Sequence, residues 1–290
     1  MPHLTMKDGV KLYYEEAGHG TPIVFVHEYA ADYRTWEPQL RAFSRSHRCI
    51  TYSQRGYPPS DVPEKVEDYD FEHQRAGILA MLDGLDIDKA HIVGLSMGAF
   101  ATFYFGMKWP ERALSLTLAG IGSGSMPEAR ARFRQESEAA ADKLLAEGWG
   151  KSAELRGNSP TRVQLQNKNP RGFAEFLAMV KQHSAKGSAM TLKGYQALRP
   201  SLGDFKEQMT KCRVPTLVIS GDEDEPCLDA SLMLKRHMPS AGLVFMPQTG
   251  HACNLEEPDL FNMVCEKFFH QVESGQYRMR DPRATPERML

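Results

Sequence analysis

The sequence predicts an α/β protein built on a largely parallel sheet that helices cover on both faces. Short, unbroken apolar runs alternate with longer stretches of helical periodicity along most of the chain. Strands of a parallel sheet are buried on both faces and therefore read as continuous apolar runs, with helices connecting one strand to the next. The chain has 290 residues, of which 41% are hydrophobic and 25% charged, which is enough for one or two domains with a sizeable core.

The elements can be assigned in order along the chain. Asp8-Gly9 separates two strand-like stretches, which predicts a hairpin near the N-terminus. Buried strands are predicted at residues 23–26, 49–52, 90–93, 114–119, 216–220 and 243–246. Helices are predicted at residues 33–44, 71–85, 97–107, 228–237 and 258–272. Most of the strands are followed by a helix, which is the connection that parallel neighbours require.

Residues 121–213 interrupt this alternation. The stretch has no convincing buried strand and is rich in residues that favour helices. Because a structureless loop of this length is improbable in a compact domain, we predict a helical cap inserted into a core of residues 1–120 and 214–274. Residues 275–290 are predicted to be a polar C-terminal tail. The apolar residues expected to pack within the cap and cover a pocket are Phe133, Leu144, Trp149, Phe173, Phe176, Met179 and Tyr195.

The charge and the cysteine content limit the classes of binding partner that we expect for this protein. Lysine and arginine number 35 and aspartate and glutamate 37, so the net charge of −2 gives no reason to expect nucleic acid or an anionic membrane. No apolar run approaches the roughly 20 residues that span a bilayer, and the N-terminus does not resemble a signal peptide. The five cysteines are scattered without metal-ligand spacing. We therefore expect a cytoplasmic protein with reduced thiols, no metal and no cofactor, acting on a small molecule, and a homodimer is possible.

The strongest chemical signal is Gly94-Leu95-Ser96-Met97-Gly98. It directly follows a predicted strand and directly precedes a predicted helix. In that context the glycines allow a tight turn that presents the serine hydroxyl at the carboxyl end of the sheet. The free N–H groups of the following helix point to the same place. We therefore predict Ser96 as a catalytic nucleophile.

A serine nucleophile needs a base, and the base needs an acid to orient it. His251 follows the last predicted strand and is the best base. The loop Gly221-Asp222-Glu223-Asp224-Glu225 follows the preceding strand and supplies the acid. All three groups lie after strands, so they should meet at one sheet edge. The residues alone leave open which of the four acids is used.

These motifs, in the order Ser, acid, His, resemble those of the α/β-hydrolases. The resemblance spans nearly the whole chain and implies an eight-stranded, mostly parallel sheet with a helical cap after the sixth strand. It implies that the second aspartate of Gly-Asp-x-Asp is the acid, which is Asp224, with Asp222 as the alternative. It also implies an oxyanion hole formed by the backbone N–H groups of Tyr29 and Met97.

One departure from the family pattern lies in the oxyanion loop, where Glu28 follows His27 in place of the usual glycine. A carboxylate beside an oxyanion would be repulsive, so we expect its side chain to point away; the alternative is that it contacts a polar substrate.

Together the motifs predict a cofactor-free serine hydrolase of small or medium carboxylic esters. The same triad could cleave a carbon–carbon bond in a diketone or open a lactone. A protein of another class, a small-molecule receptor with this fold, is a further alternative.

Overall fold

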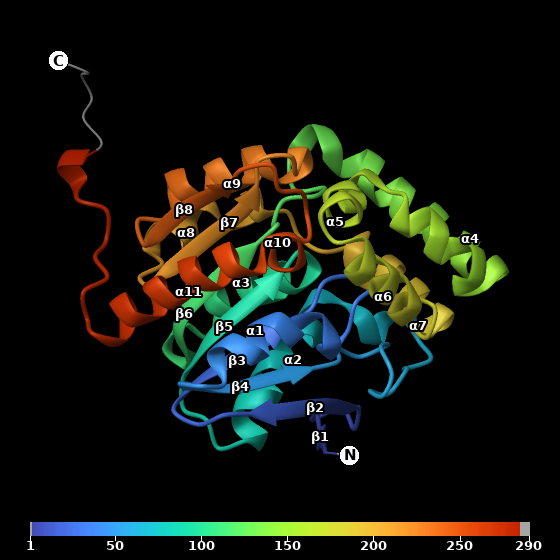
Figure 1. Cartoon of the computed structure of the whole chain (residues 1–290), viewed down its shortest axis with the longest axis horizontal. Helices are drawn as coiled ribbons and strands as arrows, with labels where there is room; N and C mark the ends of the chain where they lie inside the picture. Colours follow the sequence, from blue (N-terminus) through green and yellow to red (C-terminus); the bar gives the residue numbers. More distant parts are fainter. Residues whose placement is uncertain (1, 285–290) are drawn as a thin grey trace.

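The chain folds around one eight-stranded sheet, as predicted (Figure 1). The structure is a computed structural model, and it describes residues 2–284. The strand order is β1-β2-β4-β3-β5-β6-β7-β8. β2 pairs antiparallel with both of its neighbours, β1 and β4, and all the other neighbours pair parallel. The strands are β1 (His3–Thr5), β2 (Lys11–Ala17), β3 (Thr21–Val26), β4 (His47–Tyr52), β5 (Ala90–Leu95), β6 (Ala113–Ala119), β7 (Thr216–Gly221) and β8 (Ala241–Met246).

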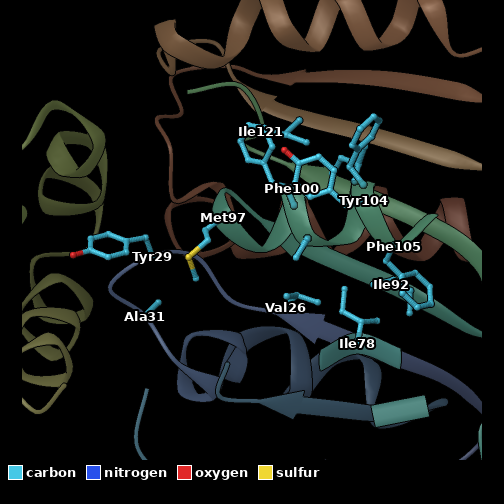
Figure 2. Close-up of a cluster of buried hydrophobic side chains, with 14 of the residues drawn as sticks. Val26, Tyr29, Ala31, Ile78, Ile92, Met97, Phe100, Tyr104, Phe105 and Ile121 are labelled. Carbon is cyan, nitrogen blue, oxygen red and sulfur yellow. The ribbon is translucent and has the colours of Figure 1, made fainter. Parts of the chain in front are cut away.

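Helices cover both faces of the sheet because successive residues of each parallel strand point to opposite sides. Val24 and Val26 of β3 belong to one apolar cluster, and Ile23 and Phe25 belong to the other. The first cluster contains residues of α2 (Phe71–Gly84), α3 (Met97–Lys108) and α9 (Glu225–His237). Figure 2 shows Phe100 and other side chains of the first cluster packed around α3. The second cluster contains residues of α1 (Glu37–Phe43), α10 (Cys253–Glu256) and α11 (Pro258–Glu273).

The segment between β6 and β7 is helical. It contains α4 (Pro127–Gly157), α5 (Val163–Lys168), α6 (Pro170–Val180), α7 (Ala185–Thr191) and α8 (Lys206–Lys211). Figure 1 shows α4 to α7 together on the side toward which the parallel strands point, whereas α8 lies beside the core. We refer to α4 to α7 as the cap. A buried contact of 3.0 Å between Asp32 Oδ2 and His183 Nε2 fastens the cap to the loop after β3.

The last described residues lie at the amino ends of β7 and β8, on the side of the sheet away from the cap. The Tyr277 hydroxyl lies 3.0 Å from the carbonyl oxygens of Thr216 and Ser240, where β7 and β8 begin. The Arg280 guanidinium donates to carbonyl oxygens near the end of α9. Residues 285–290 of the predicted tail lie outside the described residues. Among residues 2–284, no helix is both long enough and apolar enough to cross a membrane.

Candidate active site

Ser96 occupies a strained turn between β5 and α3. Its φ of 53° and ψ of −113° are unfavourable for a residue with a side chain. The flanking glycines make the turn possible, because a Cβ on Gly98 would lie 2.1 Å from the carbonyl oxygen of Val26. A Cβ on Gly94 would lie 2.3 Å from the carbonyl oxygen of Gly98. The turn therefore depends on glycine at both positions, and Ser96 remains partly exposed.

His251 and Asp224 are joined by a hydrogen bond of 2.7 Å between Nδ1 and Oδ2. Each residue has only 3% of its surface exposed. Burial by itself would raise the pKa of the Asp224 carboxyl, but the charge of His251 and the hydrogen bond with it hold that pKa below its usual value. An ionised Asp224 can accept a hydrogen bond from the Nδ1–H group, which leaves Nε2 of His251 unprotonated and available as a base.

Asp222, the alternative acid, bonds with the backbone of the loop after β8. It is exposed, and its Oδ1 accepts a hydrogen bond of 3.1 Å from the backbone N–H of Thr249. It therefore supports the loop that carries His251, whereas Asp224 contacts the imidazole itself.

Ser96 and His251 line one cavity of about 400 Å³ at the carboxyl edge of the sheet. Much of its wall comes from α4, including Phe133, Leu144 and Trp149, which were expected to cover a pocket. Phe176 and Met179 instead line a separate cavity of about 670 Å³ beside α1. Tyr195 is fully buried, and its hydroxyl donates to the carbonyl oxygen of Met97 over 3.3 Å.

The two amides proposed for the oxyanion hole are available as donors. Within residues 2–284, no hydrogen-bond acceptor is found for the N–H of Tyr29 or of Met97. The start of α3 packs tightly on residues 26 and 27, which brings the loop that carries Tyr29 close to the serine turn. Figure 2 shows the Tyr29 ring pointing away from the sheet. The ring lies 6.3 Å from that of Trp149 in the cap.

Glu28 is fully buried and pairs with cap residues. Its carboxylate bonds with the guanidinium of Arg162, and Arg156 lies 3.6 Å away. Burial by itself would raise the pKa of this carboxyl, but the positive charge of Arg162, followed by those of His251 and Arg156, holds it below its usual value. Glu28 is not among the residues that line the cavity with Ser96. The side chain turns to the cap arginines, in agreement with the expectation that it points away from the oxyanion.

Cys227 lies beside the acid and the base, although nothing in the sequence marked it as part of the site. Its Sγ lies 3.3 Å from the carbonyl oxygen of Gly120 and 4.0 Å from His251 Nδ1. Asp224, Cys227 and His251 offer potential metal-ligand atoms within 4.8 Å of one another. A metal ion there would require His251 to give up its bond with Asp224 and Cys227 to lose its proton. Burial and the neighbouring Asp224 raise the pKa of that thiol well above its usual value.

A family model described as the α/β hydrolase fold matches residues 21–258. The chain belongs to the α/β-hydrolase family. This hydrolase is 24% identical over 259 residues to 3-oxoadipate enol-lactonase 1 of Acinetobacter baylyi (strain ATCC 33305 / BD413 / ADP1), covering 87% of this chain and 89% of that protein.

Two solved structures show how closely the fold of the hydrolase follows its relatives. The enol-lactonase from Burkholderia xenovorans LB400 superposes with a TM-score of 0.80 at 23% identity, covering 93% of this chain and all of that chain. A thermophilic esterase from Thermogutta terrifontis has a TM-score of 0.82 at 24% identity, covering 93% and 98%. The predicted class of protein, a hydrolytic enzyme with this fold, is thereby confirmed.

Three arginines of the site were not found by sequence reasoning. Arg156 and Arg199 line the cavity of the hydrolase, and Arg162 holds Glu28. In the sequence, nothing distinguishes these arginines from the other charged residues of their segments. Such residues ordinarily lie on solvated helix faces, and here all three are largely or fully buried.

Proposed function

We propose that this α/β-hydrolase is a cofactor-free serine hydrolase that cleaves a small or medium carboxylic ester through an acyl-enzyme. The observation that carries the proposal is the arrangement of the base. His251 lines the same cavity as Ser96, and its Nδ1 is bound to Asp224 over 2.7 Å. An imidazole held in this way has Nε2 available for the serine proton.

In the proposed reaction, Ser96 Oγ attacks the ester carbonyl carbon while its proton passes to His251 Nε2. The carbonyl oxygen becomes an oxyanion between the N–H groups of Tyr29 and Met97. The tetrahedral intermediate breaks its bond to the alcohol oxygen, which takes the proton from His251. Water then attacks the acyl-enzyme and gives a proton to His251, and the proton returns to Ser96 Oγ as the acid leaves.

A lactone is the second candidate substrate, because it is a cyclic ester that the same steps would open. The similarity to 3-oxoadipate enol-lactonase 1 over 87% of the chain supports it.

All five cysteines are buried and free. Free thiols support the proposed cytoplasmic location.

The test is labelling with a fluorophosphonate probe, followed by mass spectrometry of the modified peptide. We expect modification of Ser96 in the wild-type enzyme and none in Ser96→Ala. Ser123→Ala is the matched control, since Ser123 lines the same cavity but lies outside the turn that presents Ser96. Modification of another serine, or unchanged activity in Ser96→Ala, would refute the assignment.

A substrate panel distinguishes the remaining alternatives. We expect turnover of ethyl esters or of lactones, with an acyl group retained on Ser96 in trapped samples. Turnover restricted to diketo acids would indicate a carbon–carbon hydrolase instead. Ligand-induced thermal stabilisation without turnover would indicate a receptor.

A further inference from the structure

Arg199 is a buried cation in the wall of the cavity that contains Ser96 and His251. We propose that it binds a carboxylate of the substrate, separate from the bond that is cleaved. The preferred substrates would then be half-esters of dicarboxylic acids or lactones that carry a carboxylate. This inference rests on the proposed ester hydrolysis and specifies its substrate class.

The first argument is the missing counter-charge. Arg199 has 2% of its surface exposed, yet no carboxylate of residues 2–284 lies within ion-pair distance of it. Its Nη2 donates to the carbonyl oxygen of Ser123, but Nε and Nη1 are buried without a partner in the described part of the chain. A buried cation that lacks a counter-ion carries a large desolvation cost. An anionic ligand would supply both the charge and the acceptors.

The neighbouring arginines show what a compensated site looks like in the same protein. Arg162 bonds with Glu28, and Arg156 lies 3.6 Å from the same carboxylate. Arg130 adds a second unpaired cation next to Arg199, since its guanidinium donates to the Arg199 carbonyl oxygen and has no carboxylate partner among residues 2–284. Arg162 and Arg156 therefore share a carboxylate, whereas Arg199 and Arg130 have none among residues 2–284.

The second argument is that the Arg199 guanidinium is held in place. Its central carbon lies 3.8 Å from the ring centre of Phe100 and 4.8 Å from that of Phe133. Contacts with aromatic rings stabilise a cation and fix its plane while leaving its N–H groups free. A fixed donor loses little conformational entropy when a carboxylate binds, which favours recognition.

The third argument is the composition of the cavity wall. Ser152 also lines the cavity, and its hydroxyl is buried without a partner within residues 2–284. It can donate a second hydrogen bond to an anion. The cavity volume of about 400 Å³ suits a small molecule, so one ligand could reach both Arg199 and Ser96.

The experiment compares monoethyl succinate, glutarate and adipate with ethyl esters of uncharged acids of the same chain length. We expect kcat/KM for the best half-ester to exceed that of its neutral counterpart at least about tenfold, as for a hydrogen bond to a charged group. Equal values, or a preference for the neutral ester, would overturn the inference while leaving ester hydrolysis intact.

Arg199→Met tests the residue itself, because a methionine side chain can pack between the two phenylalanine rings. We expect kcat/KM for the half-ester to fall about 10- to 100-fold, mainly through KM, with the neutral ester nearly unchanged. Arg199→Lys should restore part of the difference. Lys143→Gln is the control, since Lys143 is an exposed cation at the same cavity, and it should affect both esters little. An equal loss for both esters in Arg199→Met would show a structural role only.

Binding measurements keep the inference testable if no ester is hydrolysed. Calorimetry would compare glutarate with the neutral glutaramide on the wild-type protein and on Arg199→Met, with circular dichroism to verify folding. Glutarate binding that Arg199→Met abolishes would support the carboxylate site even where the proposed reaction fails. The absence of glutarate binding by the wild-type protein would overturn it.

Discussion

Glu28 and Arg162 form an ion pair across 134 residues of chain, and neither side chain has any exposed surface. Glu28 lies in the loop after β3, directly before Tyr29, and Arg162 lies in the cap directly before α5. The pair therefore connects the proposed oxyanion loop with the segment that covers the cavity. Glu28, which departs from the glycine of the family pattern, serves here as an attachment point for the cap.

Glu28→Gln should destabilise the protein by about 3 kcal/mol, because it leaves the Arg162 charge buried without a carboxylate. Urea unfolding followed by circular dichroism would measure this. Glu37→Gln is the matched control, since Glu37 pairs with Arg41 on the surface. Its loss should be below about 0.5 kcal/mol. Equal small losses for both variants would show that the buried pair contributes nothing.

Asp224→Asn should lower kcat/KM by roughly 10³- to 10⁴-fold, because the amide favours the wrong tautomer of His251. Asp222→Asn should change kcat/KM little, since asparagine retains an oxygen that can accept from the Thr249 N–H. Steady-state kinetics on one ester would test both variants. A larger loss in Asp222→Asn would reverse the assignment of the acid.

The burial of a neutral His27 should make the protein less stable in mild acid than at neutral pH. Its Nε2 accepts a hydrogen bond of 2.9 Å from the Gln54 N–H, so the ring must be neutral, and burial lowers its pKa from 6.5 to about 4. Because the unfolded chain binds this proton more readily, the stabilisation is complete above about pH 6.5 and is lost as the pH falls toward 4. This lowering of the His27 pKa corresponds to about 3 kcal/mol in the free energy of unfolding.

Unfolding free energies measured between pH 7 and pH 4 would show this slope. His27→Gln should reduce it, while the exposed His19→Gln should leave it unchanged. Part of the slope should remain in His27→Gln, because burial also lowers the pKa of His91 to about 4. An unchanged slope in His27→Gln would contradict the prediction.

Trp149→Ala should change substrate preference more than nucleophile reactivity. Trp149 lines the cavity beside Tyr29, so its removal enlarges the cavity. We expect kcat/KM to shift toward bulkier esters while a small phosphonate still labels Ser96 at a similar rate. Trp109→Ala, at the C-terminal end of α3 and outside this cavity, is the control. A uniform loss for all esters would mean that Trp149 only supports the fold.

The sheet and the three candidate catalytic residues could be predicted because their signals are local. Ser96 directly follows β5, and Asp224 and His251 lie in the loops after β7 and β8, so all three lie at the edge that the carboxyl ends of parallel strands share. The residues alone indicated only the acidic loop, and the choice of Asp224 within it came from the family resemblance. The contacts of Arg162 and Arg199 could not be predicted in this way. They depend on how the cap helices sit on the sheet, which helical periodicity does not determine. The burial of Glu28 has the same cause, since its partner lies in the cap.

The two buried contacts that fasten the cap, Glu28 with Arg162 and Asp32 with His183, also bear on how ligands exchange. Swinging the cap outward as a rigid gate would break both contacts at once, and separating the buried charges of Glu28 and Arg162 is costly. Substrate and product should therefore diffuse through the mouth of the cavity while the cap stays attached. For this enzyme, widening the entrance should accelerate product release, whereas loosening a hinge should not.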